Sequence, residues 1–173
     1  IQRVKICCGS EEKPLGAVGA LITLVLLFTG IFADYLAPYG MNEPLSGYNL
    51  APPSREVPLG ADNMGRDMLS RVIFGARVSV IIGLSASLLA TIISLIIGIL
   101  TGYIGGTLDL TVQRFVDAWM CFPGLVLLIL IMSLMGPGLW NVIITLALVF
   151  GIGGSRIIRS AVIGIKNNVY VEA

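Results

Sequence analysis

The sequence contains no histidine among its 173 residues. That absence excludes, for this chain, the Ser-His-Asp and Cys-His forms of nucleophilic catalysis, the HExxH zinc motif and most metal sites that depend on imidazole. Cysteine is also scarce, with Cys7 and Cys8 adjacent near the start and Cys121 alone in an apolar stretch. Adjacent cysteines rarely bridge each other and Cys121 is distant from both, so the spacing indicates no disulfide framework.

Charge is the second shortage. Charged residues make up 12% of the chain, whereas soluble domains average roughly 25%. Because 56% of the residues are hydrophobic, the chain has too few charges to cover the surface of a water-soluble globule. The net charge of +1 gives no indication of nucleic acid as a partner. The composition predicts a protein embedded in membrane lipid.

Long uncharged runs show where the membrane would be crossed. They cover residues 14–33, 78–108 and 118–155, and the last is interrupted by Gly136-Pro137-Gly138. A crossing needs about 20 apolar residues, and a Gly-Pro-Gly run is typical of a tight turn. The pattern therefore predicts an all-α, polytopic transmembrane helix bundle. Its four expected spans are 14–36, 78–104, 114–135 and 139–156.

The ends and the loop follow from these spans. The first apolar segment is too long for a signal peptide and runs into Asp34 without a small-residue cleavage site, which favours a retained helix. Residues 37–77 are rich in proline and glycine and are expected to form a loop. The segments expected on the same side of the membrane as the N-terminus carry more Lys and Arg than this loop. Because cytoplasmic segments are enriched in Lys and Arg, residues 1–13 are predicted to be cytoplasmic and 37–77 exoplasmic.

The most informative segment is PLGADNMGRDMLSRVIFGARVS, residues 58–79. Its glycines permit turns, and its aspartates and arginines can pair and cap within a tight loop. The residues singled out are Gly60, Asp62, Gly65, Arg66, Asp67 and Arg71. A calcium-binding loop would need a different acidic spacing and a distal glutamate. The residues themselves favour an ordered loop.

Small residues recur at helical spacing in the expected second span. They are Gly83, Ser87, Ala90, Ser94, Gly98, Thr101 and Gly105, which we call the small-residue stripe. At about 100° per residue they fall on one side of a helix. Small residues allow helices in lipid to approach closely, so packing against another helix is the favoured interpretation. A stripe that lines a pore would have the same composition, and that alternative stays open.

Arg114 and Asp117 stand three residues apart in the expected third span, where an ion pair can form on a helix. An intramembrane carboxylate can also serve a proton relay or contact a solute. Their position near the expected cytoplasmic boundary favours a structural anchor. Pro123 removes a helical hydrogen bond and is expected to kink this span.

Several of these motifs together resemble a known family. Residues 58–79 are similar to PLGTDxxGRDxLSRxxxGxRxSL, and Gly102 to Asp109 to GYxGGxxD. Arg114, Asp117, Phe122 and Pro123 are similar to RxxDxxxxFP. The family is the inner-membrane permease subunit of binding-protein-dependent ABC importers, in the dipeptide, oligopeptide and nickel branch. The resemblance implies that this chain is an N-terminal fragment with about four of about six spans.

The resemblance also implies partners and a site. Arg156, Arg159 and Val171-Glu172-Ala173 resemble the start of the cytoplasmic coupling loop, assigned to 157–173, in which Glu172 and Ala173 would contact an ATPase. A solvated glutamate at a helix start is the alternative for Glu172. The expected partners are a second homologous permease, two cytoplasmic ATPase subunits, an exoplasmic solute-binding protein and membrane lipid, with no nucleic acid.

The chain itself is expected to be no enzyme and to hold no cofactor. It has no GxxxxGK[ST] motif, so ATP and Mg²⁺ would bind the ATPase subunits. The implied location is a bacterial or archaeal inner membrane. Short peptides are the expected solutes, while nickel complexes, opines and glutathione are served by the same branch. A secondary transporter would favour charged residues at mid-membrane, and a membrane scaffold would leave the 58–79 motif unexplained.

Overall fold

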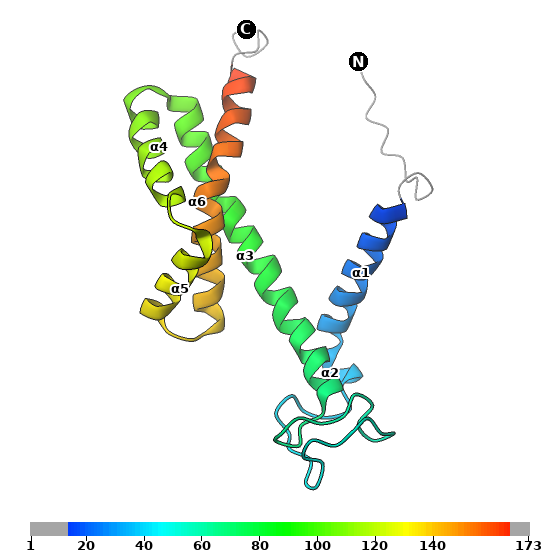
Figure 1. Ribbon diagram of the computed structural model, residues 1–173. Coiled ribbons are helices and arrows are strands. Elements are labelled where there is room, and N and C mark those ends of the chain that lie inside the picture. Colours follow the sequence, from blue (N-terminus) through cyan, green and yellow to red (C-terminus); the bar gives the residue numbers. More distant parts are fainter. Residues whose placement is uncertain (1–13, 167–173) are drawn as a thin grey trace. The chain divides into compact units, whose positions relative to one another are not determined.

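A computed structural model of the chain describes residues 14–166 and shows an all-α protein in this range. Figure 1 traces its helices. They are α1 (Pro14–Ile31), α2 (Ala33–Leu36), α3 (Met68–Ile104), α4 (Gly106–Met120), α5 (Gly124–Met135) and α6 (Leu139–Lys166). The described residues form two compact units, one ending at Ile81 and the other beginning at Ile82, so α3 contributes to both.

The first unit contains α1, α2, the loop 37–67 and the start of α3. Gly30 near the end of α1 lies against α3, where an added Cβ would be 3.2 Å from Val80 Cγ2 and 3.3 Å from Arg77 Cα. The absence of a side chain at Gly30 therefore allows the two backbones to approach. The loop has no extended sheet in the described residues, and it contains two isolated antiparallel bridges, Pro44–Arg66 and Ala61–Asp67.

The second unit is built around α6. Both α4 and α5 pack along this helix, as Figure 1 also shows. Its buried apolar side chains include Ile143 and Ile152 on α6, Val116 on α4 and Leu127 on α5. Most large apolar side chains elsewhere on these helices are exposed, as expected of surfaces that face lipid or further protein.

The helices agree with a membrane-spanning protein. α3 and α6 are each long and apolar enough to cross a bilayer, and the bent pair α4 and α5 can count as a third span. The remaining apolar helix, over Leu15–Ile31, is shorter. The expected third span, 114–135, is not one kinked helix: α4 and α5 meet at 90° across Cys121–Pro123. Pro123 cannot donate the backbone hydrogen bond that would continue α4.

Two other boundaries differ from the expected ones. The loop expected over 37–77 ends at Asp67 instead, because the Asp67 carboxylate accepts a hydrogen bond from the Ser70 N–H at 2.8 Å and caps the first turn of α3. Arg71 therefore lies on a helix. The span expected to end at residue 156 continues to Lys166, so Arg156 and Arg159 are helical residues.

Candidate functional site

The middle of α3 packs closely on α6 through small residues. Ser94 Oγ, which is buried, donates a hydrogen bond of 2.7 Å to the Gly151 carbonyl. A Cβ added to Gly98 would lie 2.6 Å from Ile158 Cβ, and one added to Gly102 would lie 2.9 Å from Val162 Cβ. Such distances leave no room for a side chain at either glycine, so this half of the small-residue stripe contacts α6.

The other half of the stripe has a different environment. Gly83 has no atom within 4 Å of an added Cβ, and Ser87 is exposed. Both line a hollow of about 500 Å³ between α3 and α6, which we call the α3–α6 hollow. Its lining residues are Ile82, Gly83, Ala86, Ser87, Ala90, Thr91, Ser94, Leu146, Phe150, Gly154, Ile157 and Ile158.

The end of the stripe needs a correction. Gly105 lies beyond the last residue of α3, and its φ of +68° takes the chain out of the helix and into α4. Thr101 is buried, but its Oγ1 donates to the Ile97 carbonyl of its own helix at 2.8 Å. Gly102 was not assigned to the small-residue stripe, although it also packs against α6: an added Cβ there would lie 2.9 Å from Val162 Cβ, compared with 2.6 Å from Ile158 Cβ at Gly98.

Two ion pairs hold α4 against α6. Arg159 donates from Nε and Nη2 to the two carboxylate oxygens of Asp109, at 2.6 and 2.5 Å. Arg156, one turn earlier on α6, pairs with Asp117. These pairs line a polar cleft of about 370 Å³ together with Gln113 and Arg114.

This arrangement revises the pair expected between Arg114 and Asp117. Their closest approach is 3.9 Å and the Arg114 side chain is 83% exposed, so Asp117 is held mainly by Arg156. The Asp117 carboxylate therefore joins α4 to α6. At the far end of α6, Lys166 Nζ donates a 2.8 Å hydrogen bond to the Tyr103 carbonyl and so caps the last turn of α3.

The loop motif at 58–79 is ordered around Asp62. The Asp62 carboxylate accepts hydrogen bonds from the N–H groups of Met64 and Arg66, at 2.8 and 2.9 Å, and from Arg71 at 2.6 Å. The backbone hydrogen bonds from Arg66 and Met64, with the Arg71 charge nearby, lower the pKa of Asp62. Gly60 and Gly65 adopt positive φ, and each closes a turn next to another backbone segment.

Asp67 fastens the loop to α3. Its buried carboxylate accepts hydrogen bonds from both the N–H and the Oγ of Ser70, at 2.8 and 2.7 Å. Ser70 Oγ in turn accepts from the Tyr39 N–H at 3.1 Å, which ties the beginning of the loop to its end. Arg66 contributes through its backbone, and its buried Nε has no hydrogen-bond acceptor within the described part of the chain.

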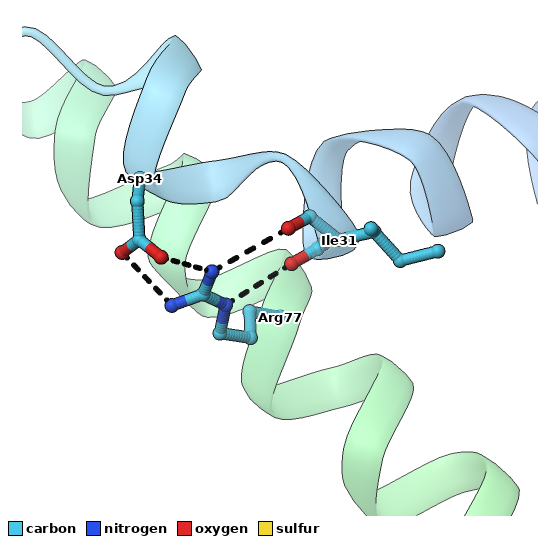
Figure 2. Close-up of polar contacts among 4 residues, drawn as sticks. Ile31, Asp34 and Arg77 are labelled. Carbon is cyan, nitrogen blue, oxygen red and sulfur yellow. Dashed lines mark hydrogen bonds and ion pairs between the residues drawn. The ribbon is translucent and has the colours of Figure 1, made fainter.

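A contact that the sequence analysis did not foresee joins α2 to α3. Arg77 donates to both carboxylate oxygens of Asp34, at 3.0 and 2.7 Å, and to the carbonyls of Gly30 and Ile31, at 3.1 and 3.5 Å. Figure 2 shows the guanidinium between the carboxylate and the end of α1. The signal in the sequence was a single acidic residue and a single arginine at the edges of two apolar runs, which spacing alone could not pair.

A second hollow, of about 360 Å³, lies where α4 and α5 meet, and we call it the break hollow. Its lining residues are Trp119, Met120, Phe122, Gly124, Leu127, Val149, Phe150, Gly153, Gly154 and Ile157. The buried Nε1 of Trp119 has no hydrogen-bond acceptor among residues 14–166.

The remaining expectations concern metals, cysteines and the chain ends. Within residues 14–166, no three Cys, Asp or Glu side chains gather as a metal site would require. Cys121 is a free, exposed thiol. Cys7, Cys8 and the expected cytoplasmic tail 1–13 lie outside the described residues, as do Glu172 and Ala173.

Comparison with known proteins agrees with the sequence resemblance. Residues 94–173 match the family described as binding-protein-dependent transport system inner membrane component. The chain is 36% identical to the dipeptide transport system permease protein DppC of Bacillus subtilis, over 94% of this chain and 51% of that protein. It is 36% identical to the di/tripeptide permease DppC of Pseudomonas aeruginosa (91% and 54%) and 35% identical to the glutathione permease GsiD of Shigella flexneri (94% and 54%). The chain thus spans about half the length of these relatives.

Proposed function

We propose that this chain, whose residues 94–173 match the family of binding-protein-dependent transport system inner membrane components, is part of the permease subunit of an ATP-driven importer of short peptides. The observation that carries this proposal is the 36% identity to two permeases whose names specify dipeptides or di- and tripeptides. In both cases the similarity covers more than nine tenths of this chain, so it includes the 58–79 motif as well as the helices α3 to α6.

The subunit would act in a complex. We expect a second, homologous permease, two cytoplasmic ATPase subunits that bind ATP and Mg²⁺, and an exoplasmic solute-binding protein. The chain itself would bind no cofactor and catalyse no reaction, because hydrolysis would occur on the ATPases. The N-terminus would lie in the cytoplasm, and Glu172 and Ala173 would contact an ATPase subunit.

The helix contacts suit a subunit that rocks as a body. The ion pairs Asp109–Arg159 and Asp117–Arg156 fix α4 to α6, and Ser94 and Gly98 fix α3 to the same helix. A movement imposed at the end of α6 by the ATPases would therefore be carried to α3 and α4 together. Alternating access can proceed by such a rigid-body rotation, in which the helices of a unit move together between two states.

Glutathione is the second candidate solute. The observation that favours it is the 35% identity to a glutathione transport system permease, nearly as high as the identity to the dipeptide permeases. Glutathione is itself a small peptide-like molecule, so both candidates need a path that accepts amide groups.

The test is reconstitution of the protein that contains this chain with its partner permease, ATPases and solute-binding protein in proteoliposomes. We expect uptake of a labelled dipeptide that requires ATP and the binding protein, and unlabelled glutathione as competitor decides between the solutes. Uptake driven by an ion gradient without ATP would indicate a secondary transporter instead. No uptake of either solute under any condition would refute the peptide-importer proposal.

A further inference from the structure

The polar cleft between α4 and α6 lies further inside α6 than the sequence indicated. The fourth span was expected to end at residue 156, which would set its charges at the membrane boundary. The helix instead continues to Lys166, about 15 Å beyond Arg156, and it begins at Leu139, about 26 Å before it. Wherever a hydrocarbon core of about 30 Å is placed along this helix, it includes Arg156.

Five charged side chains line this cleft, and ionisable groups at membrane depth are costly and usually mark the path of a solute or an ion. One pair is complete in itself. Arg159 uses two donors and Asp109 both of its carboxylate oxygens, and the Asp109 side chain is only 13% exposed. This pair has its structural role between α4 and α6 and leaves no group over for a ligand.

The other three charges are incompletely matched. Asp117 Oδ1 pairs with Arg156, but Asp117 Oδ2 accepts no hydrogen bond within residues 14–166, and its closest cation is Arg114 Nη1 at 3.9 Å. The Arg114 side chain is 83% exposed and has no other ion pair in the described part of the chain. The mouth of the cleft thus presents an open guanidinium and an open carboxylate oxygen next to each other.

This pattern selects a ligand that carries both signs of charge. A simple anion would bind Arg114 and leave Asp117 Oδ2 without a donor. A molecule with a carboxylate and an ammonium group serves both, because a guanidinium fits a carboxylate and an ammonium donates to a carboxylate oxygen. Every short peptide carries these two groups at its termini near neutral pH, whatever its side chains. The cleft volume of about 370 Å³ lies within the usual range for small-molecule sites.

We propose that the polar cleft is a binding site for the charged termini of the transported peptide, in which Arg114 binds the terminal carboxylate and Asp117 binds the terminal ammonium. The inference rests on the proposed function and adds to it a location and a recognition chemistry. Neither the α3–α6 hollow nor the break hollow is lined by a charged residue. Of the three spaces, the polar cleft is therefore the one that can offset both termini.

The first test measures peptide binding directly. The ligand is dialanine, and its dissociation constant is measured by saturation-transfer NMR on the assembled permease and ATPase subunits in lipid nanodiscs, without the solute-binding protein. Arg114→Gln removes the charge, and we expect the dissociation constant to rise roughly 2- to 5-fold, the range for an exposed ion pair. Arg55→Gln makes the same change at an exposed arginine of the loop 37–67 and should leave the dissociation constant unchanged.

The second test removes the partner group from the ligand. Dialanine amide lacks the terminal carboxylate, so Arg114→Gln should not weaken its binding further, because both changes remove the same interaction. N-acetyldialanine keeps the carboxylate, so Arg114→Gln should weaken it by the same factor as dialanine. A loss of equal size for dialanine and for its amide would show that Arg114 does not bind the carboxylate, and would overturn the inference.

Asp117→Asn gives the matching result at the other terminus. It should weaken the binding of dialanine and leave that of N-acetyldialanine, which has no ammonium, unchanged. Because Asp117 also joins α4 to α6, thermal unfolding of this variant is recorded alongside. A general loss of folded protein would weaken both ligands equally, so the selective loss is the result that supports the site.

A lipid occupant gives a different result. The headgroup of phosphatidylethanolamine carries the same two kinds of charge. It would copurify with the unmodified complex, be lost from Arg114→Gln and leave no measurable binding of dialanine. That outcome would overturn the inference, as would a dissociation constant for dialanine that is the same in the unmodified complex and in Arg114→Gln.

Failure of the inference can be separated from failure of the proposed function. If the unmodified complex takes up dipeptide with ATP but Arg114→Gln binds dialanine normally, the binding site is refuted and the permease function stands. If the dissociation constants follow the expected pattern but uptake does not require ATP, the proposed function falls and the peptide site remains.

Discussion

Arg159 of α6 binds Asp109 of α4 through two parallel hydrogen bonds of 2.6 and 2.5 Å. The two residues are 50 positions apart in the chain. The Asp109 side chain is only 13% exposed, so removal of the guanidinium would leave a mostly buried negative charge without its partner. With Asp117 and Arg156, this pair makes the contact between α4 and α6 a polar one within an otherwise apolar unit.

Removing this pair should destabilise the protein. We expect Arg159→Gln to lower the free energy of unfolding by about 1.5–3 kcal/mol, the range for hydrogen bonds to charged groups. Arg159→Lys keeps the charge but loses the parallel geometry, so it should recover part of this amount. Thermal unfolding of the purified protein in detergent measures the effect.

Arg114→Gln is the matched control for that experiment. Arg114 lies on α4 beside the same cleft but is 83% exposed, so its loss should change the free energy of unfolding by less than about 0.5 kcal/mol. Equal losses in Arg114→Gln and Arg159→Gln would contradict the assignment of α4 anchoring to the Asp109 pair.

Gly98 and Gly83 allow a second prediction from one helix. An alanine at Gly98 places Cβ 2.6 Å from Ile158 Cβ. A Cβ added to Gly83 would meet nothing within 4 Å beyond the nearby backbone of its own helix. We expect Gly98→Ala to cost about 1–3 kcal/mol through overpacking. Gly83→Ala should instead stabilise the helix by up to about 1 kcal/mol. Thermal unfolding of the two variants side by side decides the matter, and a stabilised Gly98→Ala would refute the close contact between α3 and α6.

The loop around Asp62 should respond to acid in one direction. Its backbone hydrogen bonds lower the pKa of Asp62 from 3.8. A lowered pKa in the folded state means that the ionised carboxylate stabilises the loop above the unfolded value, and that this support is lost as the pH falls through the folded value. Hydrogen exchange at the amides of Met64 and Arg66, corrected for intrinsic rates, should stay slow at pH 5 and accelerate well below pH 4.

The Asp62→Asn variant provides the comparison for the acid experiment. An amide oxygen can accept from the same N–H groups but carries no charge to hold Arg71. Exchange in this variant should be faster at pH 5 than in the unmodified protein and should lose its dependence on acid. A titration of identical shape in both proteins would show that another group controls the loop.

The sequence predicted those features that depend on neighbours along the chain. Uncharged runs indicated α3 and α6, Gly136-Pro137-Gly138 separated α5 from α6, and Pro123 marked the interruption of the third span. The size of that interruption was underestimated, since a kink was expected and the helices meet at 90°. Proline removes one donor wherever it occurs, but how far the chain then turns depends on the helix packed against it.

Features that depend on distant residues were missed for a physical reason. Asp117 was assigned to Arg114 by its i, i+3 spacing, yet Arg156 of α6 binds it. The Arg114 side chain is exposed and keeps its hydration, so it gains little from an ion pair with Asp117. The start of α3 was expected at residue 78 and lies at Met68, although Asp67 followed three residues later by Ser70 fits an N-terminal cap. The pairing of Asp34 with Arg77 across a loop was not foreseen either.

Arg77 and Asp34 carry the last prediction. Arg77 makes two kinds of contact, an ion pair with Asp34 and hydrogen bonds to the carbonyls of Gly30 and Ile31. We expect Arg77→Asp to weaken the attachment of α1 to α3, because it loses both contacts and sets two carboxylates against each other. Exchanging the residues, in Asp34→Arg with Arg77→Asp, should restore the ion pair but not the carbonyl contacts, since an aspartate at position 77 cannot donate. Protease sensitivity of the α1 segment should therefore be highest in the single variant and intermediate in the exchanged one. Full recovery in the exchanged protein would show that the ion pair alone matters, and no recovery would assign the attachment to the carbonyl contacts.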